Sequence, residues 1–127
     1  MQEHIEYLQN LGLTEYQSKA MLVLFAKREA TAEGICRHTG IPLTKIYGVL
    51  KSLEDKSVVK CSPGKPRIYR CEAPTEVLNE LIRKVASRIE TLKDAKREQL
   101  KGIKEIALPT IQREKAAHPI MQIAVAA

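Results

Sequence analysis

The sequence predicts a mainly α-helical fold with one small β-hairpin and a long helix after it. Three observations lead to this prediction. Apolar residues recur at helical spacing in three stretches before residue 57, two β-prone runs then flank a turn rich in Pro and Gly, and heptad spacing begins after Pro74. We expect a folded domain at residues 1–73, a long coiled-coil helix at 74–108 and a C-terminal tail at 109–127.

Local signals mark where the first helices begin and end. Apolar residues at helical spacing indicate a short leading helix. Thr14 and Gln17 form a capping box, in which each side chain bonds the other residue's backbone, and they begin a helix that runs to about Lys27. Thr31 is expected to cap a second short helix, which Gly40 stops.

The next helix, at 43–56, has a buried and an exposed face. Its apolar stripe consists of Ile46, Val49, Leu50 and Leu53. At about 100° per residue, the opposite face holds Thr44, Gly48 and Lys51, flanked by Tyr47 and Lys45. The roles of two of these residues stay open. Tyr47 either belongs to the exposed face or packs beside Leu43 or Leu50. Gly48 permits either a close approach to a ligand or a tight contact within the protein.

A basic hairpin follows this helix. The β-prone runs at 58–61 and 68–71 flank the turn at 62–67. The order of helix, helix, turn, helix and hairpin is that of a winged helix-turn-helix. In such a fold the last helix enters the major groove of DNA, and the hairpin tip, with Lys65 and Arg67, lies along the phosphate backbone or enters a minor groove.

Positive charge is concentrated in this region. The chain has 21 Lys+Arg against 15 Asp+Glu, and seven basic but only two acidic side chains lie within residues 42–70. A concentrated basic segment indicates a surface for a polyanion, although charge alone fits a solvated face equally well. Together with the helix face it predicts contacts with double-stranded DNA by Thr44, Lys45, Tyr47, Gly48, Lys51, Lys65 and Arg67.

The residues after Pro74 have coiled-coil spacing. Ile at a positions with Leu or Val at d positions favours a two-stranded parallel coil, interrupted by one polar layer of Lys96 and Gln99. A helix on the domain surface would also need an apolar stripe. The expected dimerisation residues are Leu78, Ile82, Val85, Ile89, Leu92, Ile103 and Ile106. A homodimer would favour a pseudo-palindromic operator, with its two helices about 34 Å apart.

Composition argues against several other classes of protein. The longest apolar run is too short for a membrane span, and no signal peptide precedes it, so a cytoplasmic location is expected. Three cysteines lack the spacing of a metal finger, and motifs for phosphate-binding loops or nucleophiles are absent, so we expect no enzyme, metal or cofactor. Cys61 and Cys71, on neighbouring strands, leave a thiol sensor conceivable.

Two alternative functions and one unassigned segment remain. A winged domain can also act as a protein-interaction module of the transcription machinery, or coat DNA without sequence preference. The apolar tail at 109–127 either packs on a partner subunit or is a frayed terminus.

Several linked segments share one family pattern. They are Leu11–Tyr16, Ala30–Ile35, Thr39–Glu54, Pro63–Arg70 and Ala73–Glu76. Over roughly residues 8–80 the sequence resembles the N-terminal DNA-binding domain of the TrmB family of archaeal-type transcriptional regulators. The resemblance implies a dimeric regulator that binds operator DNA through the helix at 43–56. Longer family members continue into a sugar-sensing domain that this sequence lacks, so no carbohydrate site is implied and the effector is unknown.

Overall fold

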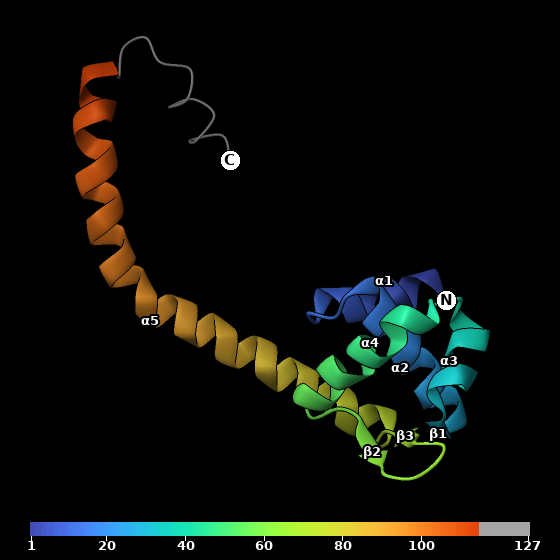
Figure 1. The fold of residues 1–127 in the computed structure, drawn as a ribbon. Coiled ribbons are helices and arrows are strands. Elements are labelled where there is room, and N and C mark those ends of the chain that lie inside the picture. The colour runs from blue at the N-terminus through green and yellow to red at the C-terminus, as the bar shows by residue number, and fades with distance from the viewer. Residues whose placement is uncertain (115–127) are drawn as a thin grey trace. The chain divides into compact units, whose positions relative to one another are not determined.

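The computed structural model describes residues 1–114, with side chains for residues 1–106. It confirms a mainly helical fold with a small antiparallel sheet and a long final helix (Figure 1). The elements are α1 (Gln2–Asn10), α2 (Glu15–Lys27), β1 (Glu29–Ala30), α3 (Ala32–Thr39), α4 (Leu43–Asp55), β2 (Lys60–Ser62), β3 (Ile68–Arg70) and α5 (Pro74–Glu114).

The expected caps account for the helix ends. The backbone N–H of Thr14 donates to Oε1 of Gln17 at 2.8 Å, and the Gln17 N–H donates to Oγ1 of Thr14 at 3.1 Å, which completes the capping box of α2. Oγ1 of Thr31 accepts the Gly34 N–H at 3.0 Å at the start of α3. Gly40 ends that helix with a φ of 77°, a left-handed conformation that glycine adopts without strain.

The Gln17 side chain also joins α2 to α4. Its Nε2 donates to Oγ of Ser52 at 2.6 Å, and Oγ of Ser52 donates to the Val49 carbonyl at 2.6 Å. Gln17 is only 7% exposed, so these bonds satisfy a polar side chain that the fold removes from water. One residue therefore begins α2 and also sets how α4 lies against it.

Apolar packing surrounds this polar joint. The stripe predicted for α4 faces the core, where Ile46, Leu50 and Leu53 are completely buried and Val49 is partly buried. They pack with a shared set of fully buried side chains from α2 and α3, namely Met21, Leu24 and Ile35. Burying side chains of this size contributes about 1.5–3 kcal/mol each before the entropy of folding is subtracted.

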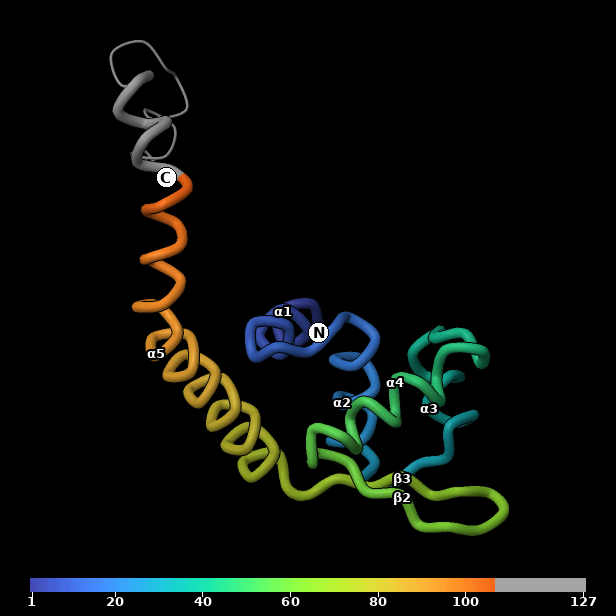
Figure 2. Tube along the Cα trace, turned by 60° about the vertical axis from the view of Figure 1, so that its left-hand side comes forward, coloured from blue at the N-terminus to red at the C-terminus, as the bar shows by residue number. Residues whose placement is uncertain are grey.

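The sheet contains one strand that the sequence did not indicate. Its order is β1–β3–β2, with both pairs antiparallel, so β3 is central. β1 is only two residues long, Glu29–Ala30, and so short a segment shows no alternation of polar and apolar residues. The predicted hairpin is confirmed as β2 and β3, although β2 begins at Lys60 and ends at Ser62 rather than spanning 58–61, and Val58 and Val59 before it are buried in the core. Figure 2 shows the loop that joins the two strands extending beyond them. We call this loop, residues 63–67, the wing.

The chain comprises two compact units, the first of which is Met1–Ser87 and the second of which begins at Arg88. The first unit includes the start of α5, because Val77 and Leu81 are buried in its core at 2% and 1% exposure. Leu78 is partly buried against the same core.

The final helix is longer than the sequence predicts. It is expected to end at 108, before Pro109, whereas α5 runs to Glu114 and passes that proline. A proline removes one backbone hydrogen bond and kinks a helix without necessarily ending it. The remainder of the expected tail lies outside the described residues.

Replacing Gln17 with Ala is expected to lower the free energy of unfolding by about 2 kcal/mol, because it removes the side-chain acceptor for the Thr14 N–H and the bond to Ser52. The measurement is urea unfolding followed by circular dichroism at a fixed protein concentration. The control is Gln9→Ala, at an exposed position of α1, which should change stability by less than about 0.5 kcal/mol. A Q17A protein as stable as Q9A would contradict the structural role.

Candidate nucleic-acid interface

The outer face of α4 is open to solvent. All the residues predicted on it are exposed, namely Thr44, Lys45, Tyr47, Gly48 and Lys51. A Cβ added at Gly48 would meet no atom within 4 Å. A tight contact within the protein is therefore not the reason for this glycine.

The wing and α4 share a groove. Half-exposed Tyr47 lines a hollow of about 370 Å³ together with the wing tip and the residues that begin α3. The wing contributes Gly64, Lys65, Pro66 and Arg67, and the start of α3 contributes Thr31, Ala32 and Glu33. The fold thus brings the predicted wing cations next to the predicted helix face, although these residues lie well apart in the sequence.

Tyr69 forms the buried base of this groove at 2% exposure. Burial raises the pKa of its phenol, and a hydrogen bond from the Arg67 side chain acts in the opposite direction. Arg67 itself remains exposed at the surface.

Some of the basic side chains in this region have an acidic partner, and others have none within 4 Å among the described residues. Lys51 pairs with Asp55 at 3.5 Å, one helical turn further along α4. Lys60 pairs with Glu72 at 3.6 Å, and Arg70 pairs with Glu29 at 3.5 Å. Within the described part of the chain no ion pair within 4 Å involves Lys45, Lys65 or Arg67. Of the cations predicted to contact DNA, those without such an ion pair lie in the wing and at the start of α4.

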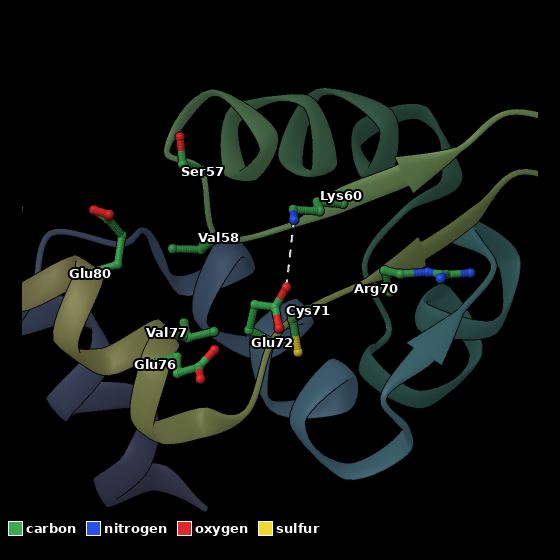
Figure 3. Close-up of a pocket in the computed structure, with 9 residues that line it drawn as sticks. All are labelled: Ser57, Val58, Lys60, Arg70, Cys71, Glu72, Glu76, Val77 and Glu80. Atoms are coloured by element: carbon green, nitrogen blue, oxygen red, sulfur yellow. Dashed lines mark ion pairs between the residues drawn. The ribbon is translucent and has the colours of Figure 1, made fainter.

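A second hollow, of about 460 Å³, lies between the sheet and the first turns of α5 (Figure 3). Val58 and Val77 supply its apolar walls, and the Lys60–Glu72 ion pair crosses it. Burial raises the pKa of the Cys71 thiol, which is visible at its edge. A raised pKa keeps the thiol protonated and less reactive.

The other chemical sites considered in the sequence analysis find little support. Cys61 lies opposite Tyr69 in the strand register rather than opposite Cys71, and all three cysteines are free and partly buried. Among the residues the structure describes, no group of three His, Cys, Asp or Glu side chains could hold a metal ion. No helix within that same part of the chain is both long and apolar enough to cross a membrane.

Sequence reasoning missed one exposed residue of this surface. Leu43, the first residue of α4, is 54% exposed beside Tyr47. The sequence predicts Leu43 only as a packing partner of Tyr47, because a leucine next to an apolar stripe is usually buried. Its spacing of four residues from Tyr47 was the available signal that both lie on one face.

Comparison of the sequence with known families and proteins gives a consistent result. The model of the family described as "Sugar-specific transcriptional regulator TrmB" matches residues 8–75. The HTH-type sugar sensing transcriptional regulator TrmBL1 of Pyrococcus furiosus is 37% identical over 110 residues, which cover 87% of this chain and 32% of the relative. The DNA-binding HTH-type transcriptional repressor TrmBL2 of Thermococcus kodakarensis is 28% identical, with 90% of this chain and 41% of the relative covered.

Solved structures agree with these sequence relationships. A structure of TrmBL2, described as an archaeal chromatin protein with a novel mode of DNA binding, superposes with a TM-score of 0.72 at 29% identity, over 89% of this chain and 45% of that one. A possible transcriptional regulator from Methanosarcina mazei has a TM-score of 0.57 at 16% identity over 69% and 80%, which shows a shared fold. The chain spans about a third to under a half of the length of the TrmBL1 and TrmBL2 relatives.

The protein is expected to lose stability as the pH rises above about 10, the ordinary pKa of tyrosine, because Tyr69 ionises in the unfolded chain before it does so in the fold. A Tyr69→Phe variant should keep more of its pH 8 stability at pH 11, measured as the urea midpoint by circular dichroism. Tyr7→Phe, at an exposed position, is the control and should follow the wild type. Equal alkaline losses in Y69F and wild type would contradict the burial argument.

Proposed function

Because the chain belongs to the TrmB family of transcriptional regulators, we propose that it is a sequence-specific regulator that binds double-stranded DNA as a homodimer. In this proposal α4 enters the major groove and the wing lies on the phosphate backbone. The observation that supports it most directly is the groove that unites Tyr47 of α4 with Lys65 and Arg67 of the wing.

The available charges suit the two proposed roles. Lys65 and Arg67 are exposed cations without an acidic partner within 4 Å among the described residues, so they can neutralise phosphates directly. Thr44, Tyr47 and Gly48 supply a face of low charge, which suits contact with base edges. Lys45 and Lys51 flank this face, and Lys51 shares its charge with Asp55.

The homodimer is proposed from the apolar side chains of α5. Beyond the turns buried in the core, large apolar residues recur at heptad positions and are between 46% and 79% exposed. These are Ile82, Ile89, Leu92, Ile103 and Ile106, with Val85 less exposed between them. A stripe of this kind is stabilised by burial against a second helix, and the expected polar layer of Lys96 and Gln99 would fix the register.

The relatives favour DNA as the partner and also support a second candidate function. One of them is named a DNA-binding repressor, while the TrmBL2 structure is described as that of a chromatin protein. Non-specific architectural binding is therefore the second candidate, and it would use the same wing cations without base contacts. A protein-interaction module has no comparable support from the relatives.

The proposal is tested by fluorescence anisotropy of labelled duplexes from a genomic fragment pool, titrated with protein at several salt concentrations. The expected result is binding that weakens steeply with salt and retains one fragment above the pool. Salt-dependent binding without any preferred fragment would establish the architectural candidate instead. No binding at low salt would overturn the DNA proposal.

The variant K51A/K65A/R67A is expected to bind the selected duplex at least about 10-fold more weakly at 0.1 M salt, because three phosphate contacts are removed. The slope of log affinity against log salt should fall by about 2–3 for the same reason. K19A/K27A/K93A removes the same charge from α2 and α5 and serves as the matched control. A control that weakens binding as much as K51A/K65A/R67A would mean that only net charge matters.

Ile89→Glu is expected to convert the dimer to a monomer at micromolar concentration, because it places a charge within the apolar stripe of α5. Analytical ultracentrifugation gives the mass directly. Thr91→Glu adds the same charge outside the heptad a and d positions and should leave the dimer intact. A wild-type protein that sediments as a monomer, or an I89E protein that remains dimeric, would contradict the proposed coil.

A further inference from the structure

Two large apolar side chains are exposed at the start of α4. Leu43 is 54% and Tyr47 is 49% exposed, and their spacing of four residues puts them on one face, a single turn apart. The large exposed apolar residues described in the first unit are Met1, Tyr7, Leu43, Tyr47 and Ile82. Of these, only Leu43 and Tyr47 belong to the helix proposed to enter the major groove.

The core does not account for Leu43. The apolar stripe of α4 is already complete, with Ile46, Leu50 and Leu53 at 0% exposure. Leu43 is also the first residue of the helix, and it is the N-terminal residues of such a helix that reach base edges in helix-turn-helix complexes. Its side chain therefore stands at the position where sequence is read.

The neighbouring side chains point to one kind of base contact. Among the side chains that pair with two atoms of guanine or adenine, residues 43–48 of α4 include Lys45 but no Arg, Asn or Gln. Lys45 is two residues from both Leu43 and Tyr47 and so lies about 160° away around the helix. What this edge presents is apolar, and the apolar group in the major groove is the C5 methyl of thymine.

We propose that Leu43, with Tyr47 beside it, is a specificity-determining contact that reads thymine C5 methyl groups in the major groove. The proposal rests on the proposed function, because it names the bases that the α4 surface recognises. Burial of one methyl group corresponds to about a fourfold change in affinity. Two half-sites, each with one such contact, therefore give about 15-fold.

The test compares two versions of the duplex selected from the pool, one with thymine and one with uracil in its place. Uracil keeps the hydrogen-bonding groups of thymine and lacks only the methyl group. Wild-type protein should bind the uracil duplex about 4- to 15-fold more weakly by anisotropy. Leu43→Ala, which retains a good helix former, should bind both duplexes alike. Tyr7→Ala, which removes an exposed aromatic side chain from α1, is the matched control and should discriminate as the wild type does.

The proposal is overturned if wild type binds the two duplexes equally, or if discrimination between them persists in L43A. Persistence counts whether L43A binds both duplexes as tightly as wild type or, with normal circular dichroism, more weakly. Each of these outcomes leaves the proposed function standing if the K51A/K65A/R67A variant still binds DNA more weakly than wild type. Failure of that function itself is distinguishable, because the wild type would then bind neither duplex. An L43A protein that loses a protein partner while its DNA binding and its discrimination are unchanged would assign the patch to protein interaction and also overturn the proposal.

Discussion

The position of α4 depends on a polar joint inside an apolar core. Gln17 closes the cap of α2 with one end of its amide and holds Ser52 of α4 with the other. Around it, Ile46, Leu50 and Leu53 are completely buried, so α4 can neither rotate nor slide without exposing them. The outer face of the helix is fixed as a result, and its exposed groups are presented in one orientation.

A buried side chain also fixes the position of the wing. Tyr69 is buried at the centre of the sheet, where β3 lies between β1 and β2. The short β1 strand contributes few contacts of its own, yet it gives β3 a partner on its second edge, so the base of the wing is paired on both sides. A wing anchored in this way loses little freedom when it binds, which favours affinity. The polar end of this surface thus suits phosphates, and the apolar end at Leu43 suits bases.

In α5 one helix has two uses along its length. Its first turns belong to the folded domain, because Val77 and Leu81 complete the core. From Ile82 onward, the apolar side chains are left exposed at heptad positions. Apolar area of this kind is costly in water, and a second copy of the chain would bury it by the same heptad rule that predicts it. Leu81, which is buried in the core, and Ile82, which is exposed, are neighbours in one continuous helix. Under the proposed function, the helix that forms the dimer would therefore continue directly from the DNA-binding domain.

The sequence by itself determined the helices, their caps and the hairpin, because capping boxes, a left-handed glycine and apolar periodicity act over a few residues. It also indicated which face of α4 is exposed. Tertiary structure decided what required distant segments: β1, the groove between Tyr47 and the wing, and the burial of Val77 and Leu81 rather than an unbroken seam from residue 78. Leu43 shows why: one residue beside an apolar stripe has the same local pattern whether buried or exposed, and only the shape of the neighbouring surfaces settles its exposure.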